Sequence, residues 1–309
     1  MNKALKYCAL AALLLGALAA VVAFAPVENP QVPASVEICG QKVDIDAQFN
    51  YERLDRELTS IMYTHGNTLL CIKRANRYFP QIAPILRECG MPDDLLYLAC
   101  IESNLASRAR SGAGAAGIWQ FMPATAKEYG LIVNDEVDER LNIELATRAA
   151  CKYFKRARST YNGDWMSAMA SYNTGMGRIS KQLREQGVES ATDLYLSEET
   201  MRYPFRVIAM KMIMENPRRY GFQLSEDQLY FPREVEVVEV DSTVTSWPQW
   251  ALDRDINFQI LRDENPWIIA QKLTNRSRHV YHVRVPMAES LKRSTARRSV
   301  YNSNWVTQQ

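Results

Sequence analysis

The sequence has almost no excess charge of either sign, and this absence narrows the classes of function. Its 309 residues include 37 Lys and Arg against 35 Asp and Glu, a formal net charge of +2. A nucleic-acid-binding domain ordinarily concentrates basic residues on one face, so we expect no nucleic-acid partner. Basic residues gather only in residues 288–309, which we predict to be a disordered tail; adhesion to an anionic envelope polymer or membrane is the alternative. They are Lys292, Arg293, Arg297 and Arg298.

Histidine is also scarce, and the cysteines follow no ligand pattern. There are three histidines, and none lies in a candidate site segment, which disfavours a Cys–His nucleophile. The cysteine spacings match no zinc motif, so we expect neither a metal ion nor a cofactor. Five cysteines follow Cys8, an odd number, and we interpret them as small buried hydrophobic residues, with a disulfide pair as the alternative. They are Cys39, Cys71, Cys89, Cys100 and Cys151.

A long uncharged run stands at the N-terminus. Lys3 and Lys6 precede residues 8–25, which carry no charge. This order is typical of an export segment, so we predict a signal peptide or an uncleaved membrane anchor in residues 1–25. Pro26 would hinder cleavage, and an N-terminal extension follows in residues 26–50. The prediction places the protein in the periplasm or cell envelope and leaves membrane attachment open.

Strand-like alternation is nearly absent from residues 51–223, where apolar residues recur at helical spacing. One such stripe comprises Ile143, Ala146, Ala150, Tyr153, Phe154 and Ala157. Pro80 is expected to open a short helix, because proline is favoured in the first turn. We therefore predict a mainly α protein whose helical domain occupies residues 51–223.

The pattern changes after Phe222. Two stretches alternate with period 2 and enclose two short helix-like pieces, which predicts a small β-α-α-β module. The strands are expected at 234–240 and 279–285, the helices at 247–252 and 258–264, the module as a whole at 234–287, and a linker at 224–233.

Gly112, Gly114 and Gly117 have the G-x-G-x-x-G spacing of a dinucleotide-binding loop. Such a loop follows a strand directly and opens the helix of a βαβ unit. The residues before Gly112 are polar and show no strand pattern, and no βαβ unit follows. We therefore reject a cofactor loop here.

A carboxylate lies on the apolar face of the helix that precedes these glycines. Glu102 continues the stripe that contains Leu95 and Ala99. Burying an ionised carboxylate without a partner is costly, so burial raises its pKa and leaves it protonated near neutral pH. The alternative is that Glu102 reaches water, or pairs with Arg108 or Arg110.

A second carboxylate is missing nearby. Glycoside cleavage normally uses two carboxylates, yet residues 103–127 contain neither Asp nor Glu. One carboxylate suffices if the substrate supplies the nucleophile. Muramic acid can do so, because its C6 hydroxyl can attack its own anomeric carbon and form a 1,6-anhydro ring.

Three blocks around these residues are similar, in order and spacing, to the signatures of the soluble lytic transglycosylase family (glycoside hydrolase family 23). They are Glu102-Ser103, residues 111–126 (SGAGAAGIWQFMPATA) and residues 170–175 (ASYNTG). The similarity extends from about residue 54 to residue 222. It implies a lysozyme-like helical catalytic domain that cleaves peptidoglycan glycan strands without hydrolysis, between N-acetylmuramic acid and N-acetylglucosamine.

The resemblance also implies roles for individual residues. Glu102 would be the acid and then the base, Ser111 would place the N-acetyl group and the reacting hydroxyl, and Tyr172 would hydrogen-bond near the Glu102 carboxyl. Ser103 would in addition orient the end of its helix. The residues expected to bind the substrate are Ser103, Gln120, Met122, Asn173 and Tyr203. Ser171 and Thr174 depart from the family's alanines, which leaves subsite preference open.

The β-α-α-β module resembles a divergent LysM domain, a fold that binds N-acetylglucosamine chains through its strand–helix loops. Residues 241–243 and 264–266 occupy the corresponding positions. The alternative is a module that only completes the fold. For the whole protein, two other functions stay open: a hydrolytic muramidase resembling goose-type lysozyme, and a noncatalytic murein-binding scaffold. Partners in the cell-wall machinery also stay open.

Overall fold

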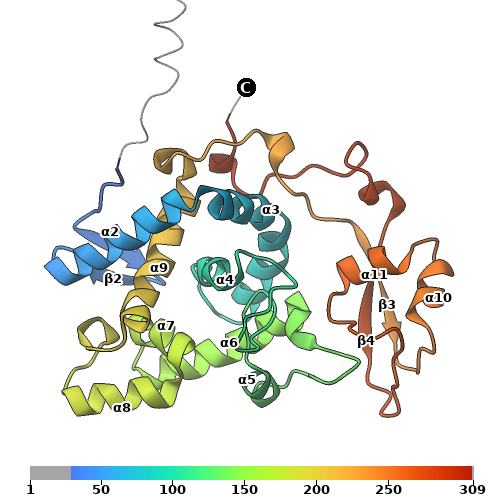
Figure 1. The fold of residues 1–309 in the computed structure, drawn as a ribbon, viewed down its shortest axis with the longest axis horizontal. Helices are drawn as coiled ribbons and strands as arrows, with labels where there is room; N and C mark the ends of the chain where they lie inside the picture. Colours follow the sequence, from blue (N-terminus) through green and yellow to red (C-terminus); the bar gives the residue numbers. More distant parts are fainter. Residues whose placement is uncertain (1–28, 308–309) are drawn as a thin grey trace, which may run out of the picture. The chain divides into compact units, whose positions relative to one another are not determined.

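The computed structural model describes residues 29–307 (Figure 1). The chain from Gln31 onward forms one compact unit. The predicted export segment, residues 1–25, lies outside the described residues. Within residues 29–307, none of the helices has the length and apolar character needed to cross a membrane.

The predicted helical region is confirmed. It consists of helices joined by loops, with α4 between α3 and α9 (Figure 1). The helices are α2 (Gln48–Tyr63), α3 (His65–Glu88), α4 (Leu95–Ser103), α5 (Pro123–Glu128), α6 (Ile143–Thr160), α7 (Trp165–Thr174), α8 (Met176–Gln186) and α9 (Glu198–Glu215). The predicted stripe of α6 is buried except for Ile143, which is half-buried. Asn142 caps the start of that helix by accepting from the Leu145 amide at 3.1 Å.

A β-hairpin precedes these helices and helps to fix α4. Strands β1 (Ser35–Ile38) and β2 (Gln41–Asp44) pair antiparallel through a two-residue turn at Cys39 and Gly40. Both turn residues have positive φ, which a tight hairpin turn requires. The amide of Cys39 donates to the Asp94 carboxylate at 2.5 Å, immediately before α4. The hairpin therefore anchors the N-terminal end of the helix that carries Glu102.

Helix α3 corrects one expectation. It runs without interruption through Pro80 and Pro84, so Pro80 does not open a separate helix. Each proline removes one backbone hydrogen bond from the helix interior. Phe79 and Ala83 are nevertheless buried on the face packed against the other helices, and this packing outweighs the local cost.

The segment expected to be a linker is packed rather than free. Leu224, Leu229 and Phe231 are buried in the helical core. The guanidinium of Arg77 on α3 donates to the Phe231 carbonyl at 3.1 Å. The chain therefore stays attached to α3 until it enters the C-terminal module.

The prediction of a disordered basic tail is wrong for the described residues, which extend to residue 307. Asn76 of α3 donates to the Ser299 carbonyl at 2.9 Å and accepts from the Tyr301 amide at 2.8 Å. Trp305 is 1% exposed, and its indole donates to the Met214 carbonyl at 2.7 Å. Apolar burial of a few aromatic residues orders this segment despite its basic composition.

The C-terminal module has the predicted β-α-α-β order. Strands β3 (Val235–Val240) and β4 (Tyr281–Pro286) pair antiparallel, with Val235 opposite Pro286 and Val240 opposite Tyr281. Helices α10 (Trp247–Leu252) and α11 (Phe258–Glu264) lie between them in the sequence. Their core includes Trp247, Leu261 and Val283, together with residues contributed by the helical region.

Candidate functional site

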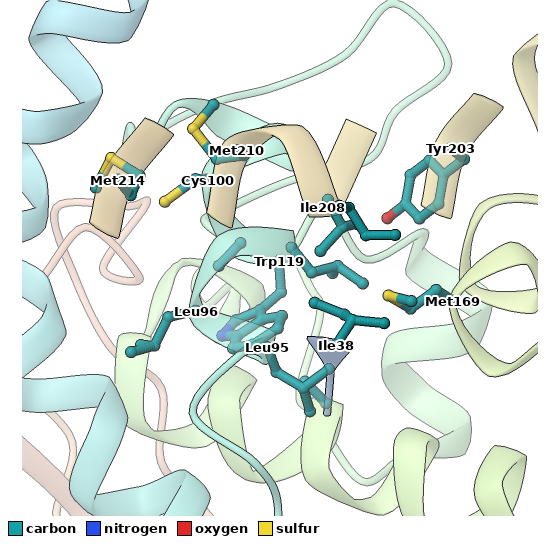
Figure 2. Close-up of a cluster of buried hydrophobic side chains, with 14 of the residues drawn as sticks. Ile38, Leu95, Leu96, Cys100, Trp119, Met169, Tyr203, Ile208, Met210 and Met214 are labelled. Atoms are coloured by element: carbon teal, nitrogen blue, oxygen red, sulfur yellow. The ribbon is translucent and has the colours of Figure 1, made fainter. Parts of the chain in front are cut away.

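Helix α4 carries Glu102 at its penultimate position, followed only by Ser103. Asn104 adopts a left-handed conformation and ends the helix, as asparagine readily does. Beneath Glu102, Leu95, Leu98 and Ala99 are buried, so the predicted apolar face is present. Figure 2 shows the buried cluster under this face, with Trp119 in its middle and Tyr203 of α9 at one side.

The Glu102 carboxyl is partly buried and is hydrogen-bonded by the Tyr203 hydroxyl. Burial raises the pKa of Glu102 to about 7, against lowering by the Tyr203 hydrogen bond and the Arg206 charge. Arg108 and Arg110, the partners considered from sequence, pair instead with Asp263 and Asp138. Glu102 therefore retains a proton near neutral pH and can donate it.

A second acid near Glu102 was missed from the sequence. Glu199, in the first turn of α9, is exposed, and its charge contributes to the raised pKa of Glu102. It lies four residues before Tyr203, so both share one face of α9. This spacing is the signal that could have identified it, because Tyr203 was already a candidate.

Tyr172 lies close to Glu102 but does not hydrogen-bond it. Its hydroxyl donates to the Trp119 carbonyl at 2.7 Å, and its ring stacks on Phe154 with centroids 5.0 Å apart. Burial, followed by the Glu102 charge, raises the pKa of Tyr172. Trp119 is fully buried and donates to the Thr147 hydroxyl at 2.9 Å, so it is a core residue and not a sugar platform.

The two candidate serines make contacts within the protein. The Ser103 hydroxyl donates to the Ile118 carbonyl at 2.9 Å and so ties the end of α4 to the glycine-rich loop. The Ser111 hydroxyl accepts from the Ala115 amide at 3.0 Å, and Ser111 is exposed. The exposure leaves the other lone pair and the hydroxyl proton of Ser111 available to a ligand.

The remaining candidates lie on neighbouring segments. Gln120 has a positive φ, and its side-chain amide nitrogen donates to the Gly117 carbonyl at 2.8 Å. Met122 is 43% exposed. Asn173, next to Tyr172, accepts from the Thr200 hydroxyl at 3.2 Å, and so connects α7 to α9.

Gly117 is required by the packing of the protein itself. Its φ is +80°, and a β-carbon there would overlap the Arg140 carbonyl. The close approach at this position is therefore between two parts of the protein backbone. Gly112 and Gly114 have open space around them, so a ligand could approach the backbone closely at these two positions.

The described cysteines are unpaired, and Cys71, Cys100 and Cys151 are buried, as small hydrophobic residues would be. Across residues 29–307, no three His, Cys, Asp or Glu side chains gather in a way that could hold a metal ion.

Two parts of the chain match known domain families. Residues 82–194 match the transglycosylase SLT domain. Residues 236–289 match the soluble lytic transglycosylase C-terminal LysM-like domain.

Named proteins are similar over parts of the chain. Membrane-bound lytic murein transglycosylase D of Escherichia coli K12 is 34% identical over 177 residues, which cover 56% of this chain and 38% of that protein. Peptidoglycan transglycosylase gp16 of phage T7 is 42% identical over 92 residues, 29% of this chain and 7% of that protein. The chain thus spans less than half the length of either relative.

Two solved structures are also similar. Lytic transglycosylase Slt of Pseudomonas aeruginosa has 23% identity and a TM-score of 0.35, over 43% of this chain and 23% of that one. The 70 kDa soluble lytic transglycosylase of Escherichia coli has 21% identity and a TM-score of 0.35, over 40% and 22%.

Proposed function

Because residues 82–194 belong to the transglycosylase SLT domain family and residues 236–289 to its C-terminal LysM-like family, we propose that this protein is a lytic transglycosylase of peptidoglycan. It cleaves the β-1,4 bond between N-acetylmuramic acid and N-acetylglucosamine and leaves 1,6-anhydromuramoyl ends. The two relatives carry the names of transglycosylases, which supports the proposal.

Glu102 acts first as the acid and then as the base. Its proton passes to the glycosidic oxygen, the bond from that oxygen to the anomeric carbon breaks, and N-acetylglucosamine leaves with a new hydroxyl. The resulting Glu102 carboxylate takes the proton of the muramic C6 hydroxyl. At the same time the C6 oxygen bonds to the anomeric carbon and closes the 1,6-anhydro ring. Glu102 ends protonated, and no water is consumed.

The other residues position Glu102 or the sugar. Tyr203 orients the carboxyl through its hydrogen bond. Tyr172 supports the site from behind through the Trp119 carbonyl, so its effect on Glu102 is indirect. Ser111 and Met122 are exposed on the loop side, where a glycan strand would bind. In this proposal Ser103, Gln120 and Asn173 support the walls of the site.

The structural observation that supports this role is the place of the Glu102 carboxyl at the end of α4, half-buried and hydrogen-bonded by the Tyr203 hydroxyl, where burial raises its pKa to about 7. The test is digestion of purified sacculi followed by mass spectrometry of the soluble muropeptides. Transglycosylation gives products one water lighter than hydrolysis does. Glu102→Gln is the control. If this variant lysed sacculi as well as the wild type does, the activity would come from a contaminating enzyme, and the protein would be a noncatalytic scaffold that binds murein.

Glu199 keeps a hydrolytic muramidase as a second candidate, because a second carboxylate near Glu102 could activate water. The two candidates predict different behaviour of Glu199→Gln. In a transglycosylase this variant retains most of its activity and still gives anhydro products. Loss of activity comparable to that of Glu102→Gln, with hydrated products from the wild type, would establish the hydrolase.

In the C-terminal module, residues 264–266 make contacts within the protein. Asn265 is fully buried; its side chain accepts from the Arg284 amide at 2.8 Å and donates to the Arg284 carbonyl at 2.7 Å. Glu264 forms an ion pair with Arg233 at 2.5 Å. These contacts favour a packing role for residues 264–266. We further propose that the protein lies in the cell envelope, attached to the membrane through residues 1–25, and that it has partners in the cell-wall machinery. Its catalytic domain is proposed to span residues 51–223 and its LysM-like module residues 234–287.

A further inference from the structure

One arginine holds two points of the glycine-rich loop, residues 111–121. The Arg140 guanidinium donates through one nitrogen to the Gly114 carbonyl at 2.8 Å and to the Phe121 carbonyl at 3.1 Å. Ser111 and Gln120 each lie close in sequence to one of these carbonyls. The position of Arg140 therefore sets the shape of the loop segment that carries both candidate residues.

A buried carboxylate fixes Arg140 in turn. Asp138 accepts from two other nitrogens of the Arg140 guanidinium at 2.8 and 2.9 Å, and their side chains are 2% and 4% exposed. Arg110 donates to the same carboxylate at 2.9 Å. Burial raises the pKa of Asp138, but the hydrogen bonds and charges of Arg140 and Arg110 outweigh it and leave the pKa below its usual range. The pair thus stays ionised and rigid.

The C-terminal module contacts the backbone of the same segment. The Asp138 amide donates to the Trp267 carbonyl at 2.9 Å, and the Ile269 amide donates to the Glu136 carbonyl at 3.1 Å. The Glu136 carboxylate also accepts from the Thr274 amide at 2.6 Å and from its hydroxyl at 3.1 Å. These bonds attach residues 136–138 to the module through an isolated antiparallel β-bridge between Val137 and Ile268.

Apolar packing joins the loop itself to the module. Ala116 of the loop is fully buried and belongs to the same hydrophobic cluster as Trp267 and Ile268. Val137 and Leu141 belong to this cluster as well. The core of the module is thus completed by residues of the glycine-rich loop and of the segment that follows it, so a shift of one disturbs the packing of the other.

We propose that the C-terminal module is a working part of the catalytic site, because it holds residues 136–140 in the place where Asp138 and Arg140 position the glycine-rich loop. Asp138 and Arg140 are positioning residues: they act on the sugar through Ser111 and Gln120. The consequence for rate rests on the proposed function, whereas the mechanical link does not. A displacement of about 1 Å in a positioned group can lower the rate about 10²-fold.

The test compares Arg140→Lys with the wild type in the full-length protein. Lysine keeps the charge but loses the planar fork that binds Asp138 and both carbonyls. The two loop amides to follow are those of Ala116, bonded to the Phe121 carbonyl, and Gly117, bonded to the Ala109 carbonyl. We expect their hydrogen exchange to accelerate about tenfold or more, while amides of α2 and α9 keep their rates. The value of kcat/KM should fall about 10- to 100-fold, mostly in kcat, with an unchanged helical circular dichroism spectrum.

Arg233→Lys is the matched control. Arg233 also forms a partly buried ion pair, with Glu264, but it lies at the edge of the module and does not contact the loop. We expect this variant to change neither the two loop amides nor kcat/KM. Equal effects of both variants, or unchanged exchange in Arg140→Lys, would overturn the proposal.

A milder variant covers the case in which Arg140→Lys does not fold. Glu136→Ala removes two side-chain contacts to Thr274 and leaves the backbone contacts in place. It should accelerate exchange of the same two amides by a smaller factor, and unchanged exchange would count against the proposal. This readout needs no activity, so it stands even if Glu102→Gln shows the proposed function to be wrong.

Discussion

Two carboxylates removed from water, Glu102 on α4 and Asp138 beside the module, have opposite pKa shifts. Asp138 has two guanidinium groups within 2.9 Å, and its pKa is lowered. Glu102 has one tyrosine hydroxyl, and its pKa is raised to about 7. Burial acts in the same direction on both, so the difference comes from the partners.

The difference separates a structural acid from a reactive one. Asp138 stays charged because its arginines compensate for the lost hydration, and the charge in turn holds the loop. Glu102 is left with no directly bonded cation within residues 29–307, so its protonated form is favoured. The same residue class therefore stabilises in one region and stores a transferable proton in the other.

Exchanging the reactive acid for its amide should have the largest effect. Glu102→Gln keeps the shape and can still accept from Tyr203, but it has no proton to give. We expect release of soluble muropeptides from sacculi to fall about 10³-fold, with binding to sacculi retained. Unchanged release from a homogeneous sample would end the assignment of Glu102.

The same exchange at the structural acid should act on stability. Asp138→Asn leaves the Arg140 charge buried without compensation, so the free energy of unfolding should fall by about 3–5 kcal/mol. Chemical denaturation measures it. The control is Glu144→Gln, whose exposed pair with Arg148 should be worth at most about 1 kcal/mol. Equal losses in the two variants would remove the distinction between Asp138 and an ordinary surface acid.

The stability of Glu102→Gln should depend on pH in the direction that its raised pKa dictates. Below the ordinary value of 4.5, Glu102 is protonated in both states and the exchange is neutral. As pH rises to about 7, Glu102 loses its proton in the unfolded chain but keeps it in the folded protein. The free energy of unfolding of the wild type therefore falls over this range. Above that pH the glutamine variant should be more stable by roughly 3 kcal/mol. Parallel curves for both proteins from pH 4 to 8 would contradict the raised pKa.

The two tyrosines should separate in the pH profile of kcat/KM. The hydrogen bond from Tyr203 lowers the pKa of Glu102, so Tyr203→Phe should move the alkaline limb to higher pH and lower the rate about tenfold. Tyr172→Phe, which loses only the bond to the Trp119 carbonyl, should leave the limb in place. An equal shift of the alkaline limb in both variants would mean that the pKa of Glu102 depends on the general polarity of the site and not on the Tyr203 hydrogen bond.

The sequence allowed the fold class to be predicted where local periodicity decides the structure. The stripe of α6 and the alternation in β4 are consequences of burial on one face, and these two elements formed as expected. Strand β3 also formed, although its Val237 is 52% exposed. The continuous course of α3 through Pro80 could not be predicted in this way. It depends on helices packed from elsewhere in the chain, which no local pattern contains.

The candidate site was predictable to a similar extent. Glu102 stands out because a carboxylate interrupts an apolar face, and this is a local signal. Its contact with Tyr203 and the charge of Glu199 arise from the packing of α9 on α4, across a long stretch of chain. The link from Arg140 to Gly114 is equally remote, and an Arg two residues after an Asp has no distinctive pattern.

The chain packs against the helical domain both before and after the C-terminal module, because its last residues return to α3 and α9. The module is therefore inserted into the helical domain, although in the sequence it follows that domain. Phe231 enters it from the helical core, and Trp305 re-enters that core after it. A fragment cut at residue 233 would therefore open a hole where the indole of Trp305 sits. Dissection of this protein calls for excising the module internally and rejoining the flanking chain, so that the last aromatic residues keep their place.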